Sequence, residues 1–178
     1  MDRLRPSVPL YIGCLLYYNM NKFSIVLIGV FFLFMGCSKS PKQSAPGVND
    51  QPDMVITLTD NSTHNVKDLT GKNVIVFFQT DCDHCQREAV DFQKNLAAFE
   101  SCAIYFLTAS PMDEIIEFST KYNLSGHANV HFGFTPATNI LNKYGPISAP
   151  SIYIYSDEHK LVKQFNGEIP VNEVIKYI

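Results

Sequence analysis

Two hydrophobic patterns follow each other in the middle of the chain and locate its main elements. The run 74–78 is apolar throughout, as expected of a strand that is buried on both faces of a sheet. After a short polar turn, apolar positions recur at steps of four, three, four and three, which is the period of one helix face. These positions are Cys85, Ala89, Phe92, Leu96 and Phe99. The sequence therefore predicts a buried strand, a turn and then a helix over about 83–99.

The rest of the domain continues the alternation of strands and helices. Apolar–polar alternation on both sides of Asp60-Asn61 predicts a hairpin over 54–59 and 63–66. The later elements are expected as a strand at 103–107, a helix at 112–122, a strand at 130–134, a helix at 136–144, a hairpin at 152–155 and 161–165, and a helix at 171–177. Such an order requires a sheet with helices on its faces. The expected fold class is α/β, with a central mixed β-sheet flanked by helices and an N-terminal β-hairpin.

The N-terminal region has the pattern of an export signal. An apolar run at 23–35 follows Asn21-Lys22, and it is shorter than the ~20 residues that span a bilayer as a helix. Gly36-Cys37 then resembles a bacterial lipobox. We interpret residues 1–36 as a signal peptide, with a true start at Met20 as one alternative, and Cys37 as the lipidation site. The other alternative is that 23–35 is an uncleaved membrane anchor.

Residues 37–52 are rich in Ser, Pro, Gln, Asn and Gly, and they are predicted to form a flexible tether. Lipid on Cys37 would anchor this tether to a membrane. The domain, residues 53–178, would then lie in the cell envelope, on the periplasmic side. Ser38 follows the cysteine in place of the aspartate that resembles an inner-membrane retention signal, so an outer-membrane anchor is favoured.

Composition narrows the class of function. The 178 residues suit one domain plus extra segments, and 46% hydrophobic residues with 12% aromatics suffice for a packed core. A net charge of −3 gives no electrostatic basis for binding nucleic acid. Of the five cysteines, three fall in the domain, namely Cys82, Cys85 and Cys102. One close pair in an odd set suggests catalysis and not a disulfide framework.

The predicted strand–turn–helix places Cys82 at a helix N-terminus and Cys85 one turn inside, facing the core. Unpaired N–H groups and the helix dipole stabilise an anion there by ~0.3–1 kcal/mol, and the thiolate is the reactive form of cysteine. A protonated His84 would act in the same direction, whereas Asp81 and Asp83 would oppose it. We therefore expect Cys82 to be a nucleophile and Cys85 a buried resolving thiol, which together form and release a disulfide.

Other uses of the cysteine pair have less support. A structural zinc site needs four ligands, and only Cys102 remains in the domain. Gln86 follows Cys85, so the haem-attachment pattern is absent. An inert structural disulfide remains a further alternative. No metal and no cofactor beyond the redox-active disulfide Cys82–Cys85 is expected.

The domain resembles a known superfamily at three places. These are Phe77-Phe78-Gln79-Thr80-Asp81-Cys82-Asp83-His84-Cys85, the hairpin before it, and Ala149-Pro150-Ser151 before an apolar strand. They resemble the thioredoxin superfamily and, within it, the TlpA/ResA-type envelope thiol–disulfide oxidoreductases, over about residues 53–178. The resemblance implies a thioredoxin-like fold.

The resemblance also implies roles for particular residues. Cys82 and Cys85 match the nucleophilic and resolving cysteines. Pro150 matches a cis-proline that leaves the backbone of Ala149 free to pair with a substrate strand, although an ordinary turn proline is the alternative. Glu88 matches a glutamate that tunes the pair and can relay a proton, and a solvated helix-face glutamate is the competing interpretation.

Other positions in and around the cysteine motif differ from the family pattern. They affect the expected redox potential and the choice of partner protein, but not the type of reaction. His84 resembles the dipeptide of strongly oxidising DsbA-type proteins. Asp81 stands before the first cysteine, where the family usually has Trp. Val76 stands where thioredoxins have a buried aspartate, and Ala89 replaces the proline that usually follows the helix glutamate.

The leading hypothesis is a membrane-tethered oxidoreductase that exchanges disulfides with envelope proteins and is served by an upstream membrane thiol reductant or oxidant. The family resemblance favours a reductant. The first alternative is a metal-binding or delivery module on the same fold. The second is a thiol peroxidase, whose signature requires a proline and a threonine at fixed distances before the cysteine; no proline lies between Gly71 and Cys82.

Overall fold

The structure, a computed structural model, describes residues 50–178. The expected signal peptide 1–36, the lipidation site Cys37 and the tether as far as residue 49 lie outside the described residues. In the described part of the chain, no helix has the length and apolar character needed to cross a membrane.

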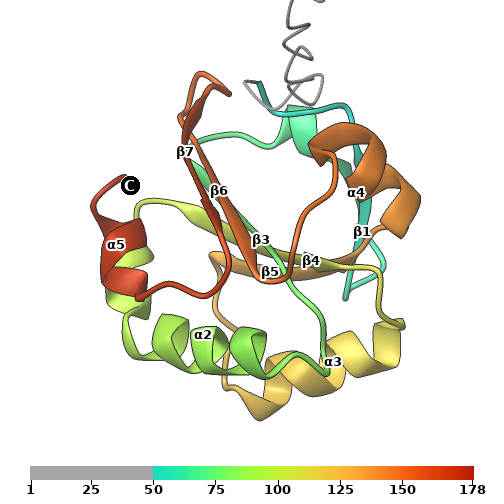
Figure 1. The fold of residues 1–178 in the computed structure, drawn as a ribbon, viewed down its shortest axis with the longest axis vertical. Helices are drawn as coiled ribbons and strands as arrows, with labels where there is room; N and C mark the ends of the chain where they lie inside the picture. Colours follow the sequence, from blue (N-terminus) through green and yellow to red (C-terminus); the bar gives the residue numbers. More distant parts are fainter. Residues whose placement is uncertain (1–49) are drawn as a thin grey trace, which may run out of the picture. The chain divides into compact units, whose positions relative to one another are not determined.

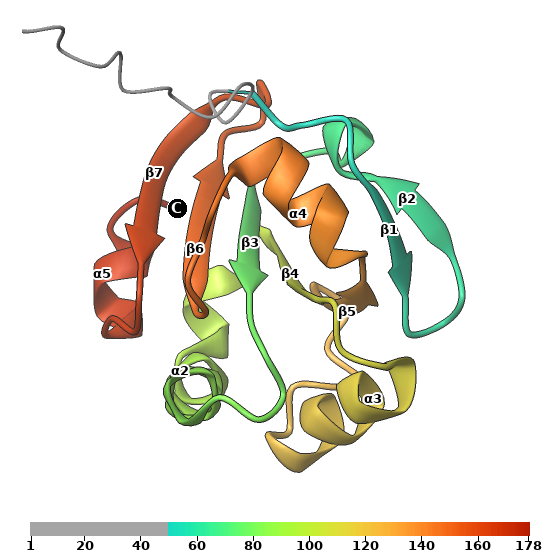
Figure 2. The same cartoon turned by 45° about the vertical axis from the view of Figure 1, so that its right-hand side comes forward.

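Within residues 50–178, seven strands form one mixed sheet (Figure 1). Their order is β2-β1-β5-β4-β3-β6-β7, which Figure 2 shows. The strands are β1 (Val55–Leu58), β2 (Thr63–Asn65), β3 (Asn73–Phe77), β4 (Ala103–Thr108), β5 (Val130–Phe134), β6 (Ser151–Tyr155) and β7 (Leu161–Asn166). Strand β4 runs parallel to both β3 and β5, whereas β6 is antiparallel to β3 and β1 is antiparallel to β5. The mixed sheet and the N-terminal hairpin expected from the sequence are both present.

Helices cover both faces of the sheet (Figure 2). They are α2 (Asp83–Lys94), α3 (Met112–Lys121), α4 (Ala137–Tyr144) and α5 (Val171–Ile175), with 3-10 turns η1 (Val66–Asp68) and η2 (Leu96–Phe99). Side chains of α2, α3 and α5 share one core cluster, and α4 packs with η1 into the other. The order of elements is the one implied by the resemblance to thioredoxins.

Strand β3 explains why an uninterrupted apolar run was needed. Val74 and Val76 point to the face covered by α2, and Ile75 and Phe77 point to the opposite face. All four side chains are buried. On the α2 side, Phe92 is fully buried and fills the space between helix and sheet. The two-sided burial fixes the end of β3, and with it the start of the turn that carries the cysteines.

The predicted helix over 83–99 is too long. Helix α2 ends at Lys94, because the side-chain amide of Asn95 donates a hydrogen bond to the backbone carbonyl of Asp91 at 2.8 Å. Such side-chain bonds to the backbone compete with helical pairing. The 3-10 turn that follows still brings Phe99 into the core, where it is fully buried. The helical period therefore predicted the burial of Phe99 correctly but not the helix end.

The domain begins slightly earlier than the expected boundary at residue 53. Asp50 forms an isolated bridge with Lys160, and the backbone N–H of Gln51 donates to the carbonyl of His159 at 2.9 Å. Gln51 is also buried. Residues 50–52, the last three of the expected tether, are therefore part of the folded domain.

Candidate active site

Cys82 lies where the sequence predicted, at the N-cap of α2. Its Sγ accepts a hydrogen bond from the backbone N–H of Cys85 at 3.3 Å, and its carbonyl accepts from the N–H of Gln86 at 3.0 Å. Helices α3, α4 and α5 instead begin directly after prolines, which suit a helix start because they lack the N–H that would be unpaired there. In α2 a sulfur atom occupies the capping position, so an anion on that sulfur would face free helix N–H groups.

The two sulfurs differ in access to solvent. Cys82 is half-buried, whereas Cys85 is only 3% exposed. Burial raises the pKa of the Cys85 thiol, and the neighbouring Cys82 and Glu88 raise it further. This is the arrangement of an accessible sulfur with a buried second sulfur, as expected for a nucleophile and a resolving thiol.

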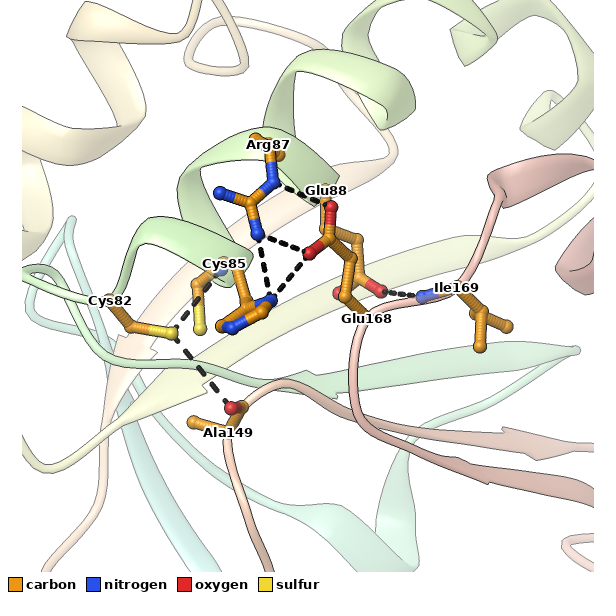
Figure 3. A network of polar contacts seen from close by, with 8 residues as sticks. Cys82, Cys85, Arg87, Glu88, Ala149, Glu168 and Ile169 are labelled. Carbon is orange, nitrogen blue, oxygen red and sulfur yellow. Dashed lines mark hydrogen bonds and ion pairs between the residues drawn. The ribbon is translucent and has the colours of Figure 1, made fainter.

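The segment before β6 lies opposite Cys82 (Figure 3). The Cys82 Sγ–H donates to the carbonyl of Ala149 at 3.8 Å, and the Ala149–Pro150 peptide bond is cis, as the resemblance implied. The pairing of Phe77 with Ser151 explains the contact, because it aligns the end of β3 with the start of β6. Cys82 and Ala149, which are 67 positions apart in the chain, are thus in contact through the Cys82 sulfur.

Glu88 is buried and not on a solvated helix face. It is 2% exposed, and desolvation raises the pKa of its carboxyl to about 8, although a hydrogen bond from the Ile169 N–H counteracts this. That bond is long, 3.5 Å to Oε1, and Oε2 has no hydrogen-bond partner among the described residues. Glu88 lies one helical turn beyond Cys85, so Glu88 and Cys85 occupy the same buried region, in which Oε2 of Glu88 is free to take part in proton transfer.

His84 contacts a glutamate from the far end of the domain. Its Nδ1 lies 2.6 Å from Oε2 of Glu168, in the β7–α5 loop. Arg87 binds both oxygens of the same carboxylate, at 2.9 and 2.6 Å (Figure 3). Hydrogen bonds from Arg87 and His84 lower the pKa of Glu168 to about 2. His84, which was expected to favour the Cys82 thiolate when protonated, thus belongs with Arg87 and Glu168 to a polar network that fastens the β7–α5 loop to α2.

The turn before Cys82 is fixed by polar contacts that sequence reasoning did not identify. Thr80 Oγ1 donates to Oε2 of Glu114 at 2.6 Å and lies 3.2 Å from the hydroxyl oxygen of Ser110. The side-chain amide of Gln86 donates to the Thr80 carbonyl at 3.2 Å. The contacts with Glu114 and Ser110 connect the cysteine turn to the start of α3, and the bond from Gln86 connects it to α2. No local spacing relates Thr80 to residues some 30 positions later, so no sequence signal could have found them.

The third cysteine of the domain is not part of this site. Cys102 is 5% exposed, and its Sγ–H donates to the carbonyl of Phe99 at 3.6 Å. All three cysteines of the described residues are free thiols. Within residues 50–178, no three His, Cys, Asp or Glu side chains gather in a way that could hold a metal ion.

Comparison with known proteins adds a family and a fold. Residues 48–164 match the AhpC/TSA family. No curated protein matches the sequence. Among solved structures, the chain is similar to a secreted Mycobacterium tuberculosis disulfide oxidoreductase homologous to E. coli DsbE, with 17% identity, 70% of this chain and 93% of that chain covered, and a TM-score of 0.60.

Two further structures have different descriptions. A peroxiredoxin-like protein from Aquifex aeolicus matches with 18% identity, 72% and 82% coverage of the two chains, and a TM-score of 0.60. Arabidopsis thaliana ScoI with copper bound matches with 13% identity, 71% and 93% coverage, and a TM-score of 0.57. At these identities the likeness establishes the fold, and the thioredoxin-like fold expected from the sequence is confirmed. The choice of chemistry must come from the site itself.

Proposed function

The chain belongs to the AhpC/TSA family, and on that premise we propose that it is a thiol–disulfide oxidoreductase with Cys82 and Cys85 as its redox pair. One observation carries the proposal: the sulfur of the half-buried Cys82 caps helix α2 and accepts a hydrogen bond from the backbone N–H of the buried Cys85 at 3.3 Å. This geometry suits a sulfur that attacks, or is attacked, from solvent while its partner is kept from competing substrates.

The reaction exchanges two electrons between the cysteine pair and a substrate disulfide. In the reducing direction, the Cys82 thiolate attacks one substrate sulfur, a mixed disulfide forms, and the other substrate sulfur leaves as a thiolate that takes up a proton. Cys85 then loses its proton and attacks Cys82 Sγ. The Cys82–Cys85 disulfide forms, and the first substrate sulfur leaves as the second thiol. The reverse sequence oxidises a substrate dithiol.

Glu88 is proposed to carry the proton of Cys85. With a pKa of about 8, its carboxyl is about nine-tenths protonated at pH 7. The protonated form can donate to the Cys85 sulfur when that sulfur leaves, in the oxidising direction. The ionised form can accept the proton when Cys85 attacks, in the reducing direction. Since the pKa of the Cys85 thiol is raised by burial, a nearby acceptor would assist this step most at mildly alkaline pH.

Location and partners form the finer part of the proposal. The resemblance to TlpA/ResA-type proteins and the Gly36-Cys37 motif support an exported lipoprotein of the cell envelope, tethered by 37–49. Its substrates would be envelope proteins with thiols or disulfides, bound along the backbone of Ala149 next to Pro150. An upstream membrane thiol reductant would restore the dithiol after each cycle, so the protein would act as a reductant.

A thiol peroxidase is the second candidate, because the AhpC/TSA match and the Aquifex aeolicus likeness favour it. In that reaction Cys82 would attack a peroxide oxygen, and water or an alcohol would leave. The sequence lacks a proline between Gly71 and Cys82, and the hydroxyl of Thr80 is engaged by Glu114. A copper-delivery role would need a further ligand beside the cysteine pair, and in the described part of the chain no such cluster exists.

Insulin reduction by the full chain in the presence of a thiol reductant tests the proposal. Turnover should be lost in Cys82→Ser and retained in Cys102→Ala, whose thiol is buried in the core. Cys85→Ser should accumulate a mixed disulfide with the substrate. Hydrogen peroxide consumption that depends on Cys82, without insulin turnover, would establish the peroxidase instead.

A further inference from the structure

An apolar groove opens beside the reactive sulfur. It has a volume of about 380 Å³, and Ala149, whose carbonyl contacts Cys82, forms part of its wall. The apolar lining includes Phe77 from β3, and Ile140 and Leu141 from α4. Leu141 is 54% exposed, so its side chain is accessible to a segment bound in the groove. The groove is therefore continuous with the proposed reaction site and offers an unfilled surface for a large apolar side chain.

An acidic hollow lies on the other side of the cysteine turn. It has a volume of about 270 Å³, and its charged lining consists of Asp81, Glu114, Glu117 and Lys121. The three carboxylates are exposed, and Lys121 places its ammonium 5.2 Å from the ring of Tyr122. Three carboxylates against one ammonium give this surface a net negative charge.

The two hollows meet at the turn that carries Cys82. Phe77, Phe78 and Gln79 line the groove, and the next two residues, Thr80 and Asp81, line the acidic hollow. The 3.2 Å contact between Thr80 Oγ1 and Ser110 Oγ joins the two rims. A chain segment that reaches Cys82 thus has the apolar groove on one side and the carboxylates on the other. The nearest large cation on α2, Arg87, is occupied by Glu168 and does not offset this charge.

We propose that the preferred substrate is a cationic protein segment, with a large apolar side chain in the groove and Lys or Arg beside Asp81, Glu114 and Glu117. The proposal rests on the thiol–disulfide exchange proposed above and specifies its substrate. Burial of a leucine- or phenylalanine-sized side chain should raise kcat/KM ~10-fold to 100-fold. Exposed charges contribute less, ~2-fold to 5-fold, and their contribution should fall as salt screens them.

Four matched peptides test this specificity with the full chain. Each carries one intramolecular disulfide, flanked on one side by Phe or Ser and on the other by two Lys or two Glu. The peptide with Phe and Lys should have the highest kcat/KM, and the preference for Lys should shrink between low and high salt. Leu141→Ser should reduce the preference for Phe. Glu117→Lys leaves two carboxylates against two ammonium groups in the acidic hollow, so it should abolish the preference for Lys.

Two variants outside the two hollows serve as controls. Ile116→Ser replaces an exposed apolar side chain of α3 that does not line the groove, and Glu173→Gln removes an exposed carboxylate of α5. Both should keep the wild-type order of the four peptides. Equal rates for all four, or faster reduction of the Glu peptides, would overturn the inference. Cys82-dependent turnover with equal rates would leave the proposed function standing, whereas absence of turnover with every disulfide would overturn both.

Discussion

The buried carboxyl of Glu88 gives the protein a specific dependence of stability on pH. Desolvation raises its pKa to about 8 in the native state, against 4.5 for an unperturbed glutamate. Between these two values the native state binds more protons than the unfolded chain, so stability falls as pH rises. Each pH unit in this window costs ~1.4 kcal/mol, or about 5 kcal/mol in all. This is an upper value, because Glu88 borders a surface hollow of about 550 Å³ through which water can reach the carboxyl.

Replacement of Glu88 by Gln removes this titration and preserves the side chain's size. The measurement is the free energy of unfolding by urea at pH 5, 6, 7 and 8, with the cysteines kept reduced. The free energy of unfolding of wild type minus that of Glu88→Gln should fall steadily over this range, because only wild type releases a proton from the native carboxyl on unfolding. Glu168, whose pKa is lowered to about 2, is present in both proteins and cancels from the difference.

Glu173→Gln serves as the matched control, because Glu173 is an exposed glutamate paired with Lys176 on α5. Its difference from wild type should stay constant from pH 5 to 8. A constant difference for Glu88→Gln as well would refute the reasoning, since Glu88 would then not hold a proton that the unfolded chain releases. A wild-type advantage that grows with pH would show that Glu88 is ionised and stabilised in the native state.

Two other features of the structure make simple predictions. Iodoacetamide should modify Cys82 in the folded protein and reach Cys85 and Cys102 only on unfolding, because the latter two are 3% and 5% exposed; equal labelling of all three, read by mass spectrometry, would contradict the burial pattern. Gly133→Ala should lower the free energy of unfolding by ~1–3 kcal/mol, since its new Cβ would lie 3.0 Å from the Thr57 carbonyl oxygen on β1; an unchanged urea midpoint would show that β1 can move aside.

The sequence was sufficient for the parts of the site that depend on local order. A doubly buried strand, a polar turn and a helical period are local patterns, and together they placed Cys82 at the cap of α2 and Cys85 beneath it. The cis bond before Pro150 followed from the resemblance and is present in the structure. The positions of the two cysteines were predictable because strand β3, the turn and the cap of α2 follow one another directly in the sequence.

Long-range contacts could not be predicted in the same way. Glu88 sits one turn from Cys85, at the border of the apolar face, and the helical period alone leaves it free to be solvated or buried. Its burial depends on Ile169 and the β7–α5 loop, which approach from 81 residues away. Glu168, which lies in the same loop, contacts His84 and Arg87 of α2. Nothing near Glu168 in the sequence signals this role.

The most direct test of the central claim is a redox titration of the full chain in buffers of reduced and oxidised dithiothreitol, followed by mass-spectrometric mapping of the disulfides. A single Cys82–Cys85 bond should form in one reversible two-electron step, while Cys102 remains a thiol at every potential. A disulfide that links Cys82 to Cys102, or the absence of any bond between Cys82 and Cys85 under oxidising conditions, would contradict the assignment of these two cysteines as the redox pair.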